Sequence, residues 1–246
     1  MLVALLTDIH GNREALAACL AHAAENNVDR YVFLGDLVGY GADPGWVVDE
    51  VRAYVARGAS AIMGNHDAAV LSGSSGMNPM AAAAIEWTRA QLDAGQRAFL
   101  RQLPMSIEER DRLFVHANAW APADWGYIVS VHEAARSIEA TRFAKTFCGH
   151  VHVPALYRVD AAGKVSAFTP GAGVGIPLLP RQRWLAVIGA VGQPRDYNPA
   201  ACYALLDDER DVLTFVRVPY DSDSAARKIL AAGLPPVLAM RLGQGY

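Results

Sequence analysis

Side chains that can bind metal ions follow five short apolar runs of this sequence. Five of its seven histidines stand at these positions. Asp, His and Asn make a borderline-to-hard ligand set, which suits Mn, Fe, Zn or Ni better than Cu(I) or Ca²⁺. We therefore predict a metal centre in which Asp36 bridges two divalent transition-metal ions. The candidate ligands are Asp8, His10, Asp36, Asn65, His116, His150 and His152.

Two of these ligand pairs have the same spacing. Asp8 and His10 are two residues apart, as are His150 and His152. In an extended segment, residues at positions i and i+2 point to the same side. Taken alone, each pair is more often a cap or a surface hydrogen bond, and Gly-Asn-His-Asp is most often a turn. Their recurrence after five apolar runs argues for one shared site.

The apolar runs predict buried strands of a parallel sheet. Leu2–Leu6 and Tyr31–Leu34 lack polar alternation, as strands covered on both faces do. Helical spacing follows each of them, and Asn12 is suited to cap the first helix. Strand and helix in turn indicate a right-handed α/β arrangement, with ligands at the carboxyl ends of the strands. The ranges are helices at 13–26 and 44–57 and a third strand at 59–63.

The middle and the end of the chain have a different texture. A polar loop at 72–76 precedes two helices at 79–91 and 94–102, which we interpret as an insertion, about 77–103, beside or over the site. A strand at 108–115 and a helix at 131–140 follow. From Ala155 onward short strands dominate, with a helix at 227–232. No linker divides the chain, so we predict one domain over 1–246.

The composition of the chain limits the classes of binding partner and the cellular compartment that we expect. The net charge is −3 and no block of Lys or Arg occurs, which disfavours a dedicated nucleic-acid surface. The three cysteines lie in apolar segments, as free thiols of a reducing compartment do. No apolar run reaches the ~18–20 residues of a membrane span, and no leader is evident, so we expect a cytoplasmic protein. The sequence does not fix the oligomeric state.

The motifs resemble the signature blocks of the calcineurin-like metallophosphoesterase superfamily, and the stretch at 191–196 looks like its small bacterial members. The resemblance implies a four-layer α/β/β/α sandwich, with two mixed β-sheets and a dinuclear site at the strand ends. All blocks are present in order. They are Asp8-x-His10, Gly35-Asp36-x-x-Gly39, Gly64-Asn65-His66-Asp67, Val115-His116 and Gly149-His150-x-His152.

The resemblance also implies roles for single residues. Asp36 would bridge the metals, and His66 would donate a proton to the leaving oxygen or clamp the phosphoryl group. Asp67 would orient the His66 imidazole and favour its protonated form. The first metal would take Asp8, His10 and His152, and the second Asn65, His116 and His150.

Asn12 and Arg195 are weaker candidates for binding substrate, together with Asn65 and His66. Arg195 can grip a phosphate through two hydrogen bonds, but a structural pair with Asp196 is an equal alternative. The segment 119–130, with three aromatic residues, could stack a base or simply pack at the rim of the core.

The resemblance implies hydrolysis of a phosphodiester or phosphomonoester by a metal-bridging hydroxide. We favour a phosphodiesterase acting on a small, nucleotide-like ester, with a broad phosphatase next. A dinucleoside polyphosphate hydrolase is a further enzyme alternative, and a catalytically silent metal-binding scaffold is the alternative from another class. A serine/threonine-type protein phosphatase is one more alternative. Those enzymes carry an Asp-Arg pair in the stretch after Gly-Asp of the second block and Glu at the end of the third. This chain has Leu37-Val38-Gly39-Tyr40 and Asp67 there, which departs from that pattern.

Overall fold

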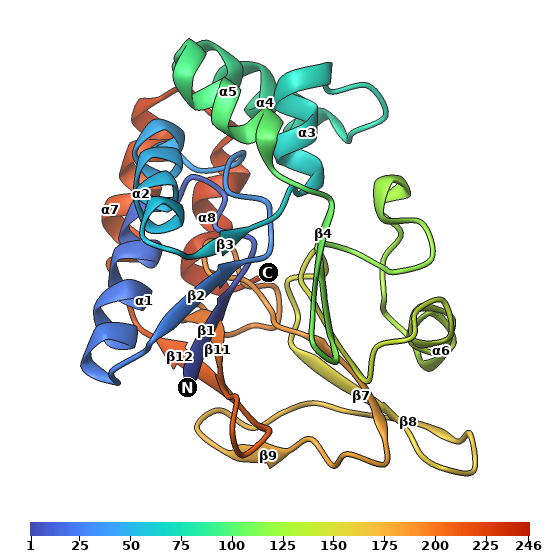
Figure 1. Ribbon diagram of the computed structural model, residues 1–246. Helices are drawn as coiled ribbons and strands as arrows, with labels where there is room; N and C mark the ends of the chain where they lie inside the picture. Colours follow the sequence, from blue (N-terminus) through green and yellow to red (C-terminus); the bar gives the residue numbers. More distant parts are fainter.

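Two six-stranded sheets lie face to face, with helices on their outer faces (Figure 1). The computed structural model describes residues 1–246. The order of layers is helices, sheet, sheet, helices, which confirms the predicted α/β/β/α sandwich of two mixed sheets.

The first sheet contains the strands that lead into the first three motifs. Its order is β3-β2-β1-β11-β12-β9, with β1 parallel to β2 and β2 parallel to β3. The strand β11 runs antiparallel to β1, and this makes the sheet mixed. The strands are β1 (Leu2–Leu6), β2 (Arg30–Phe33), β3 (Ser60–Ala61), β9 (Gly175–Pro177), β11 (Ala201–Asp207) and β12 (Val212–Val218).

The second sheet carries the remaining motifs. Its order is β4-β5-β6-β10-β7-β8, with β5, β6 and β10 parallel. Helix α6 (Val131–Glu139) covers its outer face. The strands are β4 (Ser106–Glu109), β5 (Arg112–Val115), β6 (Lys145–Cys148), β7 (Ala155–Val159), β8 (Val165–Phe168) and β10 (Arg183–Val187).

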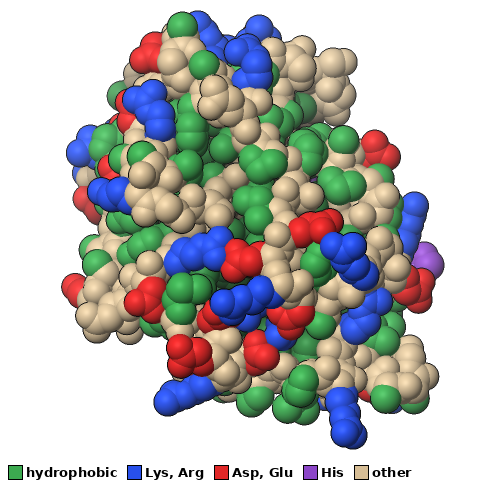
Figure 2. All heavy atoms as spheres, viewed as in Figure 1, with side chains coloured by type: hydrophobic (Ala, Val, Ile, Leu, Met, Phe, Trp, Pro, Cys, Tyr) green, Lys and Arg blue, Asp and Glu red, His purple; other side chains and the backbone are tan.

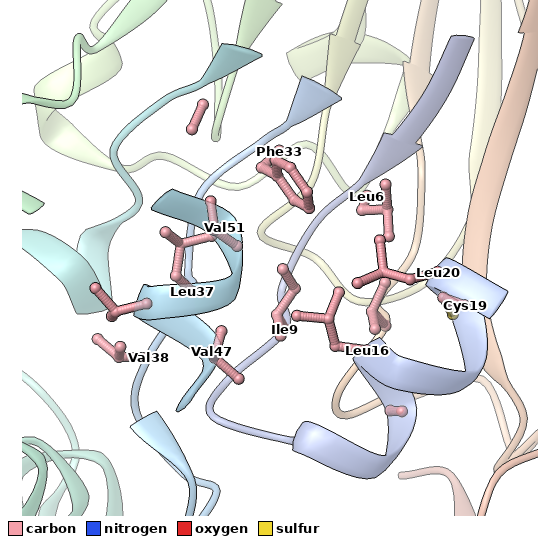
Figure 3. Close-up of a cluster of buried hydrophobic side chains, with 14 of the residues drawn as sticks. Leu6, Ile9, Leu16, Cys19, Leu20, Phe33, Leu37, Val38, Val47 and Val51 are labelled. Atoms are coloured by element: carbon pink, nitrogen blue, oxygen red, sulfur yellow. The ribbon is translucent and has the colours of Figure 1, made fainter. Parts of the chain in front are cut away.

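Alternation along the strands divides the core into layers. In β1, Val3 and Leu5 face the second sheet, whereas Ala4 and Leu6 face the helices. Two helices cover that helical side: α1 (Arg13–Glu25) and α2 (Pro44–Ala56). Figure 3 shows side chains of α1 and α2 gathered around Leu6 and Phe33. Both sides of each central strand are therefore buried, which explains why these runs lack polar alternation.

The remaining helices surround the loops at one end of the first sheet. The predicted insertion forms α4 (Pro79–Gln91) and α5 (Ala94–Gln102), with the bounds expected from sequence. Helix α3 (Asn65–Ser72) precedes them, and a 3₁₀ turn (Pro122–Asp124) lies between β5 and α6. Helices α7 (Ser222–Ala231) and α8 (Pro236–Gln244) pack against α4 and against each other.

Several predicted elements differ from the structure. Residues 108–115 do not form one strand, because the chain turns at Arg110, with φ of 52°, and pairs β4 with β5 as a hairpin. The third strand has only two residues, and α3, α8 and β9 were not predicted. The helix predicted at 227–232 begins earlier, at Ser222.

The surface carries both signs of charge. On the face drawn in Figure 2, blue and red side chains are interspersed, most densely across its lower half. None of the helices has the length and apolar character needed to cross a membrane.

Candidate metal centre

Five of the predicted ligands adopt a backbone conformation that side chains usually avoid. Asp8, His10, Asp36, His150 and His152 have φ between 50° and 68°. Left-handed backbone at non-glycine residues is uncommon, and it persists where the surroundings enforce it. Its concentration in three loops that meet at one edge of the sandwich marks this edge as a functional site.

The first group of ligand atoms comes from Asp8, His10, Asp36 and His152. All four side chains are buried, and one ligand atom from each lies within 4.8 Å of the others. The Oδ2 atom of Asp8 accepts hydrogen bonds from the Thr7 hydroxyl at 2.8 Å and from the His150 amide at 2.9 Å. Its Oδ1 atom has no hydrogen-bond partner and lies 3.2 Å from His152 Nε2. One oxygen of Asp8 is therefore anchored and the other is free to bind an ion.

A second group shares Asp36 with the first. His116 and His150 complete it, again with ligand atoms within 4.8 Å of one another. The Oδ1 atom of Asn65 lies 3.2 Å from His116 Nε2, so Asn65 joins this group. The structure thus brings all seven predicted ligands together.

Asp36 stands between the two groups. Its Oδ1 atom accepts a hydrogen bond from the His66 amide at 2.8 Å. Its Oδ2 atom lies 3.6 Å from His10 Nε2 and 3.5 Å from His116 Nε2, one histidine from each group. A single oxygen therefore faces both sides. Gly64 permits this approach, because a Cβ atom there would lie 2.2 Å from Asp36 Oδ1.

Backbone carbonyls fix the orientation of all four ligand histidines. His10 Nδ1 donates to Val38 O at 3.1 Å, and His116 Nδ1 donates to Leu34 O at 2.7 Å. His152 Nδ1 donates to Gln193 O at 2.6 Å, and His150 Nε2 donates to Trp125 O at 2.8 Å. A carbonyl oxygen can only accept, so the other nitrogen of each neutral ring presents a lone pair. Metal-binding histidines are held in this way.

The residues present fit divalent metal ions. Two carboxylates, one amide oxygen and four oriented imidazoles converge, and a buried carboxylate oxygen of Asp8 lacks a partner. Buried charge of this kind is retained when it is paired or coordinates a metal. The number and identity of the ions do not follow from this arrangement alone.

The ionisation of the metal-free site reflects burial and crowding. Burial alone would raise the pKa of Asp36, but His116 and His66 beside it bring the pKa well below its usual range. Burial likewise opposes protonation of His116, yet the charge of Asp36 raises its pKa to about 9. Burial lowers the pKa of His150 to about 3. The carboxylates are thus ionised and His150 is neutral at neutral pH, whereas His116 is protonated and must release its proton when a metal ion binds.

His66 lies beside the site, but its expected partner does not contact it. Asp67 accepts hydrogen bonds from the backbone amides of Leu37, Val38 and Gly64 at 2.9–3.2 Å, and none from His66. Burial lowers the pKa of His66 to about 4, so its imidazole is neutral in the metal-free protein. The expectation that Asp67 orients His66 and favours its protonated form is therefore wrong. Asp67 instead ties the loop that carries Asp36 to the start of α3.

Asn12 has a structural task. Its Oδ1 atom accepts from the Ala15 amide at 3.1 Å, as the predicted cap of α1, and its Nδ2 atom donates to Gly192 O at 2.8 Å. The residue is 3% exposed. Both ends of the Asn12 amide are engaged in structural contacts, so the structure gives no support to the prediction that Asn12 binds substrate.

Arg195 is placed differently from the structural alternative. Asp196 forms its ion pair with Arg217, so it does not hold Arg195. The Arg195 guanidinium instead donates to Gln193 Oε1 at 2.9 Å and lies 5.7 Å from the ring centroid of Tyr40. Tyr40 in turn contacts the rings of His10 and His66, with centroids 4.6 and 4.5 Å away. Arg195 is thus positioned beside the two residue groups.

Thr7, Tyr40 and Gln193 support the site and were not predicted. Thr7 precedes the first motif directly, and Tyr40 follows Gly39 with φ of 61°, so their proximity to the motifs was a usable signal. The carbonyls of Gln193 and Trp125 could not be found from side-chain type, because any residue supplies one.

Comparisons with known proteins agree with this geometry. The calcineurin-like phosphoesterase superfamily domain matches residues 1–211. The chain therefore belongs to this superfamily of metal-dependent phosphoester hydrolases.

Similar proteins match over nearly their whole length. A metallophosphoesterase of known structure from Sphaerobacter thermophilus is 36% identical, with a TM-score of 0.90 over 100% of this chain and 99% of that one. An uncharacterized protein of Methanocaldococcus jannaschii is 32% identical over 99% of this chain and 98% of its own. A hypothetical protein of Pyrococcus horikoshii shares the fold at 20% identity, with a TM-score of 0.82 over 100% and 98% of the two chains.

Proposed function

We propose that this protein is a dinuclear metal-dependent phosphodiesterase that hydrolyses a small phosphorylated ester. The observation that carries the proposal is the position of Asp36 Oδ2, 3.6 Å from His10 Nε2 and 3.5 Å from His116 Nε2. In this assignment Asp8, His10 and His152 hold one ion, Asn65, His116 and His150 hold the other, and Asp36 bridges them. The ligand set suits Mn, Fe, Zn or Ni.

The residues of the chain divide the remaining work. When bound, two divalent ions supply charge that neutralises phosphoryl oxygens and acidity that activates water at neutral pH. Arg195 holds a phosphoryl oxygen through its guanidinium, oriented by Gln193. His66, neutral and beside Tyr40, donates an N–H hydrogen bond to the ester oxygen that leaves.

The diester preference has a specific basis. Charge does not decide between the esters, because two divalent ions with Arg195 beside them can neutralise either a monoester or a diester, so the preference rests on space. The short helical and polar segment at 72–81 leaves an open cleft next to His66, with room for a second substituent. A broad phosphomonoesterase is the second candidate, because nothing blocks a smaller substrate from the same cleft.

The test compares bis-p-nitrophenyl phosphate with p-nitrophenyl phosphate. Protein stripped of metal is reloaded with Mn²⁺, Ni²⁺, Fe²⁺ or Zn²⁺, and its metal content is measured in parallel. We expect turnover of the diester that returns with two bound ions per chain. Preference for the monoester would move the assignment to a phosphatase, and two bound ions without turnover of either ester would favour the scaffold alternative.

His66→Ala separates catalysis from metal binding. His66 supplies no ligand in the proposal, so the variant should keep two ions and lose most of its turnover. Equal turnover of the variant and the wild type would contradict the role given to His66.

A further inference from the structure

A cleft opens directly beside the metal centre. One wall consists of α3, the loop after it and the start of α4, with Ala69, Met77 and Ala81 among the lining residues. The opposite wall consists of Trp125 and Tyr127, and the inner end is formed by Asn65, His66 and His150. In Figure 1 these walls are α3 with its following loop and the light-green segment that precedes α6. The cleft holds about 390 Å³ of accessible space, within the range of small-molecule sites.

The lining of this cleft is uncharged beyond the metal centre. None of its fifteen lining residues is Lys, Arg, Asp or Glu. Arg195 lies outside the lining, held by Gln193 and by the ring of Tyr40. No cation lines the cleft itself, and Arg89, which lies beside the lining residue Gly73, is paired with Glu86 at 3.8 Å. A chain of several phosphates would therefore place its outer negative charges against an uncharged lining. An uncharged substituent would leave no negative charge without a partner there.

Tyr127 gives the cleft a flat aromatic wall. Its ring stacks on the imidazole of His150, with centroids 4.1 Å apart and planes 18° apart. The residue nevertheless remains 53% exposed, and it lines the cleft. An exposed aromatic face beside a reactive centre is a stacking surface for bases and aryl groups.

The segment that carries Tyr127 is held in place before any ligand arrives. Asn118, itself fully buried, accepts from the Ala121 amide at 2.9 Å and donates to Gly126 O at 3.0 Å. The carbonyl of Trp125 accepts from His150 Nε2 at 2.8 Å. The aromatic wall is thus fastened to a candidate metal ligand, so little ordering is needed when a substituent binds.

We propose that this cleft binds an uncharged, planar substituent of a phosphodiester, an aryl group or a nucleoside, stacked on Tyr127. The inference rests on the proposed function and narrows its substrate class. It separates such diesters from dinucleoside polyphosphates, whose phosphate chain needs more cations than the cleft provides, and from alkyl esters, which cannot stack.

The test uses esters that share one leaving group. Wild-type, metal-loaded enzyme is assayed with the p-nitrophenyl esters of methyl phosphate, phenyl phosphate and thymidine 5′-monophosphate. In each, water adds to phosphorus and p-nitrophenolate leaves, so leaving-group chemistry is constant. We expect kcat/KM for the phenyl and thymidine esters to exceed that of the methyl ester about tenfold, within the range of stacking on aromatic side chains.

Matched variants locate the preference. Tyr127→Leu should reduce the ratio of phenyl to methyl ester to near one, whereas Tyr127→Phe should keep it. Tyr197→Leu is the control, because Tyr197 is 85% exposed and does not line the cleft. The ratio is the readout, since any loss of metal in Tyr127→Leu would lower all three rates together.

Binding without turnover gives an independent measurement. Calorimetric titration with phenylphosphonate and methylphosphonate should show about tenfold tighter binding of the former, lost in Tyr127→Leu. Equal affinities and equal rates across the series would overturn the inference but not the proposed phosphodiesterase activity. Faster hydrolysis of diadenosine tetraphosphate than of these esters would also overturn the inference. Absence of p-nitrophenolate from every ester would instead overturn the proposed function.

Discussion

The Nε2 atoms of His10 and His152 lie 3.1 Å apart in the interior of the protein. Both rings donate from Nδ1 to backbone carbonyls, at Val38 and Gln193, so both Nε2 atoms present lone pairs to each other. The unpartnered Oδ1 atom of Asp8 faces the same space, 3.2 Å from His152 Nε2. Three electron-rich atoms at this separation repel one another unless a cation lies among them.

Removal of metal should therefore destabilise the protein. An ion whose free concentration is a hundred times its Kd adds about 2.7 kcal/mol to the free energy of unfolding. We expect chelation to lower the Tm and added Mn²⁺ to restore it, as measured by thermal unfolding. In Asp8→Asn the restoring effect should largely disappear, and the metal-free variant should be as stable as the metal-free wild type or more so. A wild-type Tm that does not change when chelator is added would contradict this prediction.

The sequence sufficed for the ligand set because the fold converts order along the chain into proximity. Asp8 and Asp36 follow β1 and β2, which are parallel neighbours in the first sheet, and His116 and His150 follow β5 and β6, which are parallel neighbours in the second. Parallel pairing brings the carboxyl ends together within each sheet, and the packing of the two sheets brings the two pairs together. The supporting contacts were not predictable in this way. Asp67 was assigned to His66, its sequence neighbour, but its buried carboxylate contacts the amides of Leu37 and Val38, thirty residues away.

The elements that were not predicted have local sequences that do not indicate their structure. Helix α3 begins with Asn65-His66-Asp67, residue types that favour turns when considered alone. Helix α8 begins at Pro236 after a second proline, and this pair resembles a break although proline suits the first helical turn. Strand β9 contains Gly175 and Pro177 and forms only by pairing with β12 at the edge of the sheet. In each case tertiary contacts decide the structure.

Thr7 should matter to metal affinity although it binds no ion. Its hydroxyl donates to Asp8 Oδ2 at 2.8 Å and fixes which oxygen faces the site. Thr7→Val keeps the shape and removes this bond, so we expect metal affinity to fall about 10- to 100-fold, as for other partners of metal ligands. Titration with Mn²⁺ followed by calorimetry would measure the loss.

Thr88→Val is the matched control for Thr7. Thr88 is also fully buried, in α4, but its hydroxyl has no hydrogen-bond partner. This variant should bind metal like the wild type and lose no stability. Equal metal affinity of the two variants would show that the Thr7 hydroxyl is dispensable.

A cluster of charges far from the metal centre should make stability depend on acid. Burial alone would raise the pKa of Asp111, but Lys145, whose ammonium donates to it at 2.7 Å, holds the pKa below its ordinary value of 3.8. Because the folded-state pKa is lowered, the stabilisation is present above pH 3.8 and is lost as the pH falls through the folded-state value. Lys145→Met should therefore cost more stability at pH 6 than near pH 2.5.

The measurement is urea unfolding of metal-free wild type and Lys145→Met at both pH values, so that metal release does not contribute. The difference between the two proteins isolates the contacts of Lys145, with Asp111 and with Asp211 at 2.7 Å each, from the other charged groups. A difference that stays constant between the two pH values would refute the assignment to Asp111 and Lys145.

Removal of Arg112, which forms a buried ion pair, should lower the stability of the protein more than removal of an exposed charge. It begins β5 and pairs with Asp208, in the turn between β11 and β12, so it connects the two sheets. Both side chains are only 4% exposed, and without Arg112 the buried Asp208 keeps only the exposed Arg110, at 2.9 Å, as a partner. Arg112→Met should lower the free energy of unfolding by about 3 kcal/mol.

Arg142→Met is the control, since Arg142 and its partner Glu108 are 80% and 57% exposed, and it should cost less than about 1 kcal/mol. Both variants should keep wild-type metal affinity, because His116 follows the opposite end of β5. Equal losses in urea unfolding would mean that burial of the Arg112 pair adds nothing to the connection between the sheets.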